Sequence, residues 1–90
     1  MSKKELSILR KEIDELDERL FSLIFERMNI AKKIGKVKTQ HEIGITNSER
    51  ENELIKNIQS LPDNCLNQDE IESIYKLFFF ISKKRQDSNK

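Results

Sequence analysis

Residues 5–40 read ELSILRKEIDELDERLFSLIFERMNIAKKIGKVKTQ and decide the fold of this chain. The stretch contains no proline, and its single glycine, Gly35, comes late, so nothing breaks a helix before its last turns. Its apolar residues recur at alternating intervals of mainly three and four, at Leu6, Leu9, Ile13, Leu16, Leu20, Leu23, Ile30, Ile34 and Val37. This spacing predicts one long helix with an apolar stripe that drifts as a heptad seam does.

The length of this helix has a consequence for its surroundings. At 1.5 Å rise per residue it would be roughly 50 Å long. A chain of 90 residues forms one small domain, whose core is too small to cover such a rod from end to end. We therefore expect part of the apolar stripe to pack against another chain.

The remainder of the chain predicts two further helices and no strand, in a single domain that spans residues 1–90. Residues 41–45 break the periodicity, and Gly44 allows a positive φ there. A second helix is expected over about 48–61, ending before Pro62, and a third over about 68–87. The predicted class is all-α. Candidate capping residues are Thr46, Asn47 and Ser48 for the second helix and Asn67 and Asp69 for the third.

The third predicted helix is apolar on nearly every side between Ile71 and Ile81, which indicates burial on more than one face. Ser82 and Gln86 come after this apolar segment, near the end of the same helix. Because they are four residues apart, they lie on one helix face. Two interpretations are open. Either this end frays into solvent, or a hydroxyl and an amide project toward a cavity.

Composition narrows the class of protein. The formal net charge is +1, so no overall field attracts nucleic acid or an anionic membrane. Residues 83–85 are basic, which we interpret as favourable charge at a helix C-terminus. Cys65 is the only cysteine, which is typical of a reducing compartment. No signal segment or membrane span is recognisable. We expect a cytoplasmic protein with no nucleic-acid or membrane partner.

Arg27 interrupts the apolar stripe of the first helix. Lys38 follows eleven residues later, about 20° around the helix and roughly 16 Å along it. Between these two cations the same face carries the low side chains of Ala31 and Ile34. The pair is suited to clamping a small molecule with two negative groups. The alternative is that both side chains extend past the stripe into solvent.

Arg10 does not fit the same site in the same chain. It precedes Arg27 by 17 residues, which places it about 100° around the helix and roughly 25 Å along the axis. If two copies of the helix pair antiparallel about a twofold axis, Arg10 of one chain can lie beside the cations of the other. Alternatively, Arg10 pairs with Glu5 or Asp14 on its own helix. Spacing alone leaves both arrangements open.

Several segments together resemble one enzyme family. They are LRKEIDELD at 9–17, ER at 26–27, GKVK at 35–38, ERE at 49–51, and finally Ser82 and Gln86. In this order they resemble the all-helical, type II class of chorismate mutases, over about residues 5–86. No single motif is specific. The resemblance depends on six polar positions that stay in register across three helices.

The resemblance implies an intertwined helical homodimer with shared active sites. Such an enzyme is an isomerase that rearranges chorismate to prephenate, in the shikimate pathway toward phenylalanine and tyrosine, and it needs no cofactor and no metal. The sequence ends four residues after Gln86, so we expect the stand-alone form without a fused dehydratase or dehydrogenase.

The resemblance also implies roles for individual residues. Arg10 of the partner chain and Arg27 would bind the two carboxylates, while Lys38 and Gln86 would be the catalytic pair at the ether oxygen. Glu51 would hold the ring hydroxyl with Arg50 beside it.

Ser82 would lie near the ring carboxylate. A different position, Asn47, departs from the family. Asn47 stands where the family commonly has an aspartate, so contact with the hydroxyl there lacks a charge.

Two other functions remain open at this stage. A lyase of the same fold would release pyruvate from isochorismate using similar cations, although Glu51 and Gln86 favour the mutase. A non-catalytic helical dimerisation module would suit the apolar stripe, but it would leave Arg27 and Lys38 without a role.

Overall fold

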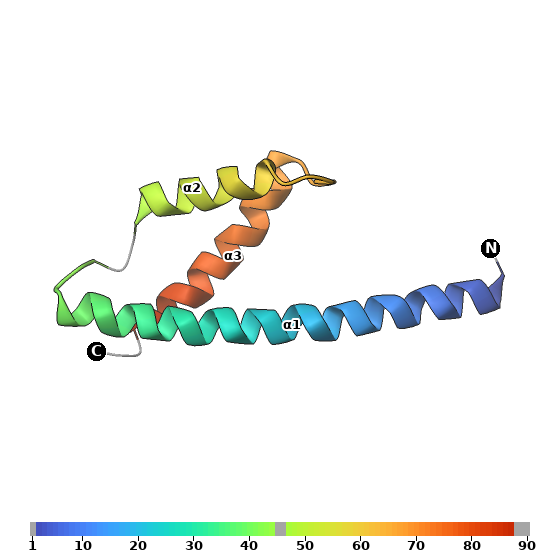
Figure 1. Cartoon of the computed structure of the whole chain (residues 1–90), viewed down its shortest axis with the longest axis horizontal. Helices are drawn as coiled ribbons and strands as arrows, with labels where there is room; N and C mark the ends of the chain where they lie inside the picture. Colours follow the sequence, from blue (N-terminus) through green and yellow to red (C-terminus); the bar gives the residue numbers. More distant parts are fainter. Residues whose placement is uncertain (1, 45–46, 88–90) are drawn as a thin grey trace.

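The computed structural model describes residues 2–44 and 47–87. In this part the chain forms the helices α1 (Lys3–Gln40), α2 (Ser48–Gln59) and α3 (Gln68–Asp87), and no strand. The prediction of an all-α chain with three helices, one of them very long, is confirmed. In Figure 1, α1 runs the full length of the molecule, and α2 and α3 lie beside its C-terminal half.

Local hydrogen bonds explain where the helices begin. Ser2 caps α1, because its hydroxyl accepts a hydrogen bond of 3.1 Å from the Glu5 amide, and α1 therefore begins two residues before the expected position. At α3 the cap is Asn67, which exchanges reciprocal 2.9 Å hydrogen bonds with Glu70. Thr46, a candidate cap for α2, lies outside the described residues. α2 ends at Gln59, two residues before the expected Leu61.

The end of α1 corrects one expectation. The positive φ after this helix belongs to Glu42, at 56°, and not to Gly44. The amide of Ile43 donates to the carbonyl of Lys38 at 2.7 Å, and the amide of Glu42 donates to Thr39 at 3.3 Å. These two bonds form a Schellman motif, which requires a left-handed residue at the position that Glu42 occupies.

The packing of the helices depends on α3. It contacts both α1 and α2, whereas among the described residues no Cα atom of α1 lies within 8 Å of one in α2. The buried apolar side chains are Met28 and Ala31 of α1 and Ile71 of α3, and α2 buries no residue. α3 therefore joins the other two helices, and the core within one chain is small.

Large apolar side chains remain exposed along α1. Every residue from 2 to 23 is exposed, and Leu23 and Phe25 keep about 61% and 62% of their surface accessible. α3 is also less enclosed than its composition indicated, since Leu77 and Phe80 are each 58% exposed. One chain offers only two neighbours to α3, so its third face stays open. Within the described ranges, no helix combines the length and apolarity required to cross a membrane.

The closest approach between α1 and α3 occurs at Gly35. A Cβ atom at this position would lie only 2.5 Å from the backbone oxygen of Gln86 and 2.8 Å from its carbonyl carbon. Such distances are far inside van der Waals contact, so the two backbones could not approach this closely with any side chain at position 35.

We predict that Gly35→Ala destabilises the fold even though alanine is the better helix former. The overpacking cost of about 1–3 kcal/mol should exceed the roughly 1 kcal/mol gained in helix propensity. Gly44→Ala is the matched control, because a Cβ there meets no atom within 4 Å. Chemical denaturation followed by circular dichroism, at one protein concentration, measures both. A Gly35→Ala protein as stable as wild type would show that α3 shifts without cost.

Candidate active site

A cavity of about 450 Å³ opens among the three helices. It is lined by residues from all three helices and from the cap of α2. Seven of the eight sequence-predicted site residues line it: Arg27, Lys38, Asn47, Arg50, Glu51, Ser82 and Gln86. The eighth, Arg10, does not. The apolar part of the lining is made by Ile30, Ala31, Ile34, Leu54 and Phe79.

The α1 wall carries Arg27 and Lys38, with Ala31 and Ile34 between them. Arg27 reaches across to α3, where its Nη1 donates a 2.7 Å hydrogen bond to the Ser82 hydroxyl. The same guanidinium lies over the Phe78 ring, 5.4 Å from its centroid. Arg27 is therefore held on the core side by α3 rather than extended along the outer surface of α1.

The α3 wall carries Ser82 and Gln86 at buried positions. They retain 6% and 9% of their surface accessible, so the interpretation that this end frays into solvent is wrong. The Ser82 hydroxyl also lies 3.7 Å from the Met28 sulfur, and the side-chain oxygen of Gln86 is buried. Polar groups at this depth are shielded from water. Their electrostatic interactions are therefore stronger than they would be in solvent.

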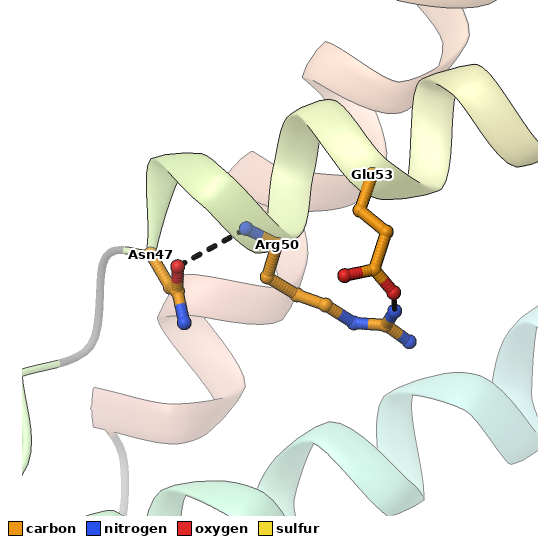
Figure 2. A network of polar contacts seen from close by, with 3 residues as sticks. All are labelled: Asn47, Arg50 and Glu53. Carbon is orange, nitrogen blue, oxygen red and sulfur yellow. Dashed lines mark hydrogen bonds and ion pairs between the residues drawn. The ribbon is translucent and has the colours of Figure 1, made fainter.

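The α2 wall begins with Asn47, Arg50 and Glu51. Figure 2 shows that the Asn47 side-chain oxygen accepts a hydrogen bond from the Arg50 backbone amide, at 3.1 Å. The Arg50 guanidinium pairs with Glu53 along the same helix. Because its oxygen caps α2, Asn47 presents its NH₂ group, a donor, as its other hydrogen-bonding group. A carboxylate at this position would offer a second acceptor instead.

One lining residue, Lys83, was missed by the sequence analysis. Its ammonium lies 3.2 Å from Glu51 Oε2, which joins α3 to α2 across the cavity. We had interpreted residues 83–85 as favourable charge at a helix end. The signal that could have identified Lys83 is its position three residues before Gln86, since residues three apart share a helix face. Lys84, by contrast, lies over the Phe80 ring at 4.4 Å.

The charge of the lining favours an anion. Four cationic side chains, Arg27, Lys38, Arg50 and Lys83, line the cavity with one carboxylate, Glu51. A cleft that is lined mainly by charges of one sign concentrates the electric field on a ligand of the opposite sign. The arrangement can hold a small molecule with more than one negative group, and it offers donors and one carboxylate, Glu51, for the neutral polar groups of that molecule.

Arg10 lies on the exposed N-terminal half of α1, in a separate hollow that Leu6, Ser7 and Asp14 also line. Within the described residues it forms no ion pair with Glu5 or Asp14. The structure of one chain therefore leaves Arg10 away from the cavity and does not support its pairing on its own helix.

Comparison with known proteins identifies the family of this chain. Residues 9–87 match the profile of the family described as chorismate mutase type II. This chain belongs to that family. The match covers all three helices except the first residues of α1, and it includes all of the predicted site residues.

Two curated relatives of this family member are enzymes. The bifunctional chorismate mutase/prephenate dehydratase of Aquifex aeolicus is 43% identical over 58 residues, which cover 64% of this chain and 16% of the relative. The chorismate mutase of Methanocaldococcus jannaschii is 38% identical over 58 residues, covering 64% of this chain and 59% of the relative. The chain thus spans less than two thirds of the length of either relative.

A solved structure resembles the fold as a whole. A conserved hypothetical protein from Pyrococcus furiosus superposes with a TM-score of 0.78 at 30% identity. The superposition covers 94% of this chain and 99% of that one, so the two share the arrangement of all three helices.

The capping role of Asn47 can be tested without any ligand, through the stability of the protein. We predict that Asn47→Ala lowers the free energy of unfolding by about 1 kcal/mol, whereas Asn47→Asp retains the cap and the stability. Asn52→Ala, the same change inside α2, should be neutral or stabilising. Thermal and urea unfolding would measure the three variants. Equal stability of Asn47→Ala and Asn52→Ala would contradict the capping role.

Proposed function

We propose that this protein is a chorismate mutase, an isomerase that rearranges chorismate to prephenate on the route to phenylalanine and tyrosine. The observation that carries the proposal is one cavity lined by Arg27 and Lys38 of α1, Glu51 of α2, and Ser82 and Gln86 of α3. These are the residues that the family resemblance singles out. Membership of the chorismate mutase type II family supports the same conclusion.

The reaction is a one-step pericyclic shift, so it requires neither a nucleophile nor an acid–base pair. The first task of the enzyme is to hold a flexible dianion in its folded, reactive conformer. Arg27 would bind one carboxylate, and its hydrogen bond to Ser82 fixes the guanidinium before substrate arrives. Glu51 would accept a hydrogen bond from the ring hydroxyl and so set the orientation of the ring.

The second task is to stabilise the negative charge that develops on the ether oxygen as the carbon–oxygen bond breaks. Lys38 and Gln86 would donate to that oxygen from opposite walls of the cavity. The buried position of Gln86 supports this role, because donors fixed in a site without water need no reorganisation during the reaction. Removing one such donor typically costs roughly 3–4 kcal/mol of transition-state stabilisation.

We also infer that the working form is an intertwined homodimer. The exposed apolar stripe of α1 supports this, since contiguous apolar surface of this extent marks an interface. Twofold pairing of α1 with its copy would bring Arg10 of one chain to the cavity of the other and give two equivalent sites. Arg10 would then bind the second carboxylate. The single cysteine, Cys65, accords with activity in the cytoplasm.

The direct test is to add chorismate to the purified protein and follow its loss together with the formation of prephenate. Lys38→Ala and Gln86→Ala should each lower kcat/KM by about 100- to 1,000-fold. Lys84→Ala, outside the cavity, should leave it unchanged. Release of pyruvate from isochorismate, without turnover of chorismate, would instead assign the lyase activity. If the protein converts neither compound, the remaining function is that of a non-catalytic helical dimerisation module.

A second prediction tests the shared site. Arg10→Ala and Arg27→Ala should each be nearly inactive alone. When the two are unfolded together and refolded at equal ratio, about one quarter of the sites should regain activity, because only one site of each mixed dimer is intact. Each variant refolded by itself is the control. A mixture that stays inactive would show that Arg10 does not act across the dimer.

A further inference from the structure

We propose that Lys83 is a positioning residue of the active site, which holds the Glu51 carboxylate in place and neutralises it for a dianionic substrate. The inference rests on the proposed mutase function. Lys83 Nζ lies 3.2 Å from Glu51 Oε2, and both residues line the cavity. The two side chains are 38% and 25% exposed, so the pair lies at the rim of the cavity rather than in open solvent.

The need for this contact follows from the charge of Glu51. A carboxylate that faces a dianionic substrate repels it unless a cation compensates the charge. Lys83 supplies that cation from α3. Because the ammonium contacts Oε2, the other carboxylate oxygen is left in position to accept a hydrogen bond from the ring hydroxyl. With its charge compensated by Lys83, the Glu51 carboxylate can serve as a hydrogen-bond acceptor for the neutral ring hydroxyl.

The contact also bears on the position of α2. This helix buries no residue and approaches α3 alone among the described helices. Glu51 lies in its first turn, and Lys83 lies between Ser82 and Gln86 on α3. An ion pair between them fixes the distance from the hydroxyl-binding group on α2 to the polar groups on α3.

The neighbouring lysine provides a matched comparison. Lys84 carries the same charge but lies over the Phe80 ring at 4.4 Å and does not line the cavity. A general effect of positive charge at the end of α3 would be shared by Lys83 and Lys84. An effect through Glu51 would belong to Lys83 alone.

The experiment compares steady-state kinetics with chorismate for Lys83→Met, Lys83→Arg and Lys84→Met. Lys83→Met should raise KM by about tenfold while changing kcat less than about threefold, because the ring hydroxyl takes no part in bond making or breaking. Lys83→Arg keeps the cation and should restore KM to within about threefold of wild type. Lys84→Met should match wild type. Circular dichroism verifies folding, and Lys83→Gln replaces Lys83→Met if the latter does not fold.

A double-mutant comparison separates action through Glu51 from direct contact with substrate. In a Glu51→Gln background, Lys83→Met should change KM by less than about twofold, because the charge to be neutralised is gone. An equal rise in KM in both backgrounds would overturn the positioning role.

The outcomes also distinguish the inference from the function on which it rests. A wild-type protein that does not convert chorismate overturns both. Conversion by wild type, with the same kinetic constants for Lys83→Met and Lys84→Met, overturns the role of Lys83 and leaves the mutase function standing.

Discussion

The close approach of α1 to α3 at Gly35 is the constraint on which the rest of the structure depends. The missing side chain lets the backbone of Gln86 lie directly against α1. Ser82, one turn earlier on α3, then comes within 2.7 Å of Arg27. Because α2 approaches α3, but not α1, to within 8 Å between the described Cα atoms, its position follows from the same crossing. A single glycine thereby determines how three walls of the cavity stand relative to one another.

The described interior of the chain combines a small apolar core with two buried polar side chains of the candidate site. Met28, Ala31 and Ile71 are the buried apolar side chains, while Ser82 and Gln86 are buried polar ones. So small a core gives little hydrophobic stabilisation to a domain of 90 residues. The large apolar side chains along the stripe of α1 remain exposed in the single chain. In the homodimer that we propose, burial of this stripe and the arrival of Arg10 at the cavity would both depend on α1.

The sequence allowed most of the fold to be predicted, because its signals are local. The intervals in the apolar stripe predicted α1, and Asn47 and Asn67 were among the caps expected for α2 and α3. Lys83 was missed because a basic residue near a helix end also fits the helix dipole, and only the crossing of α2 and α3 shows which lysine faces inward. Glu42 was missed because a left-handed residue after a helix is usually glycine.

The weak attachment of α2 makes it the helix whose displacement should cost least. This helix has no buried residue, and local opening costs least where few apolar contacts are lost. Backbone amides of α2 should therefore exchange with deuterium sooner than those of α1 and α3 around Gly35 and Gln86. Displacement of α2 would move the wall that carries Glu51 and would leave the Arg27–Ser82 hydrogen bond and the crossing at Gly35 in place.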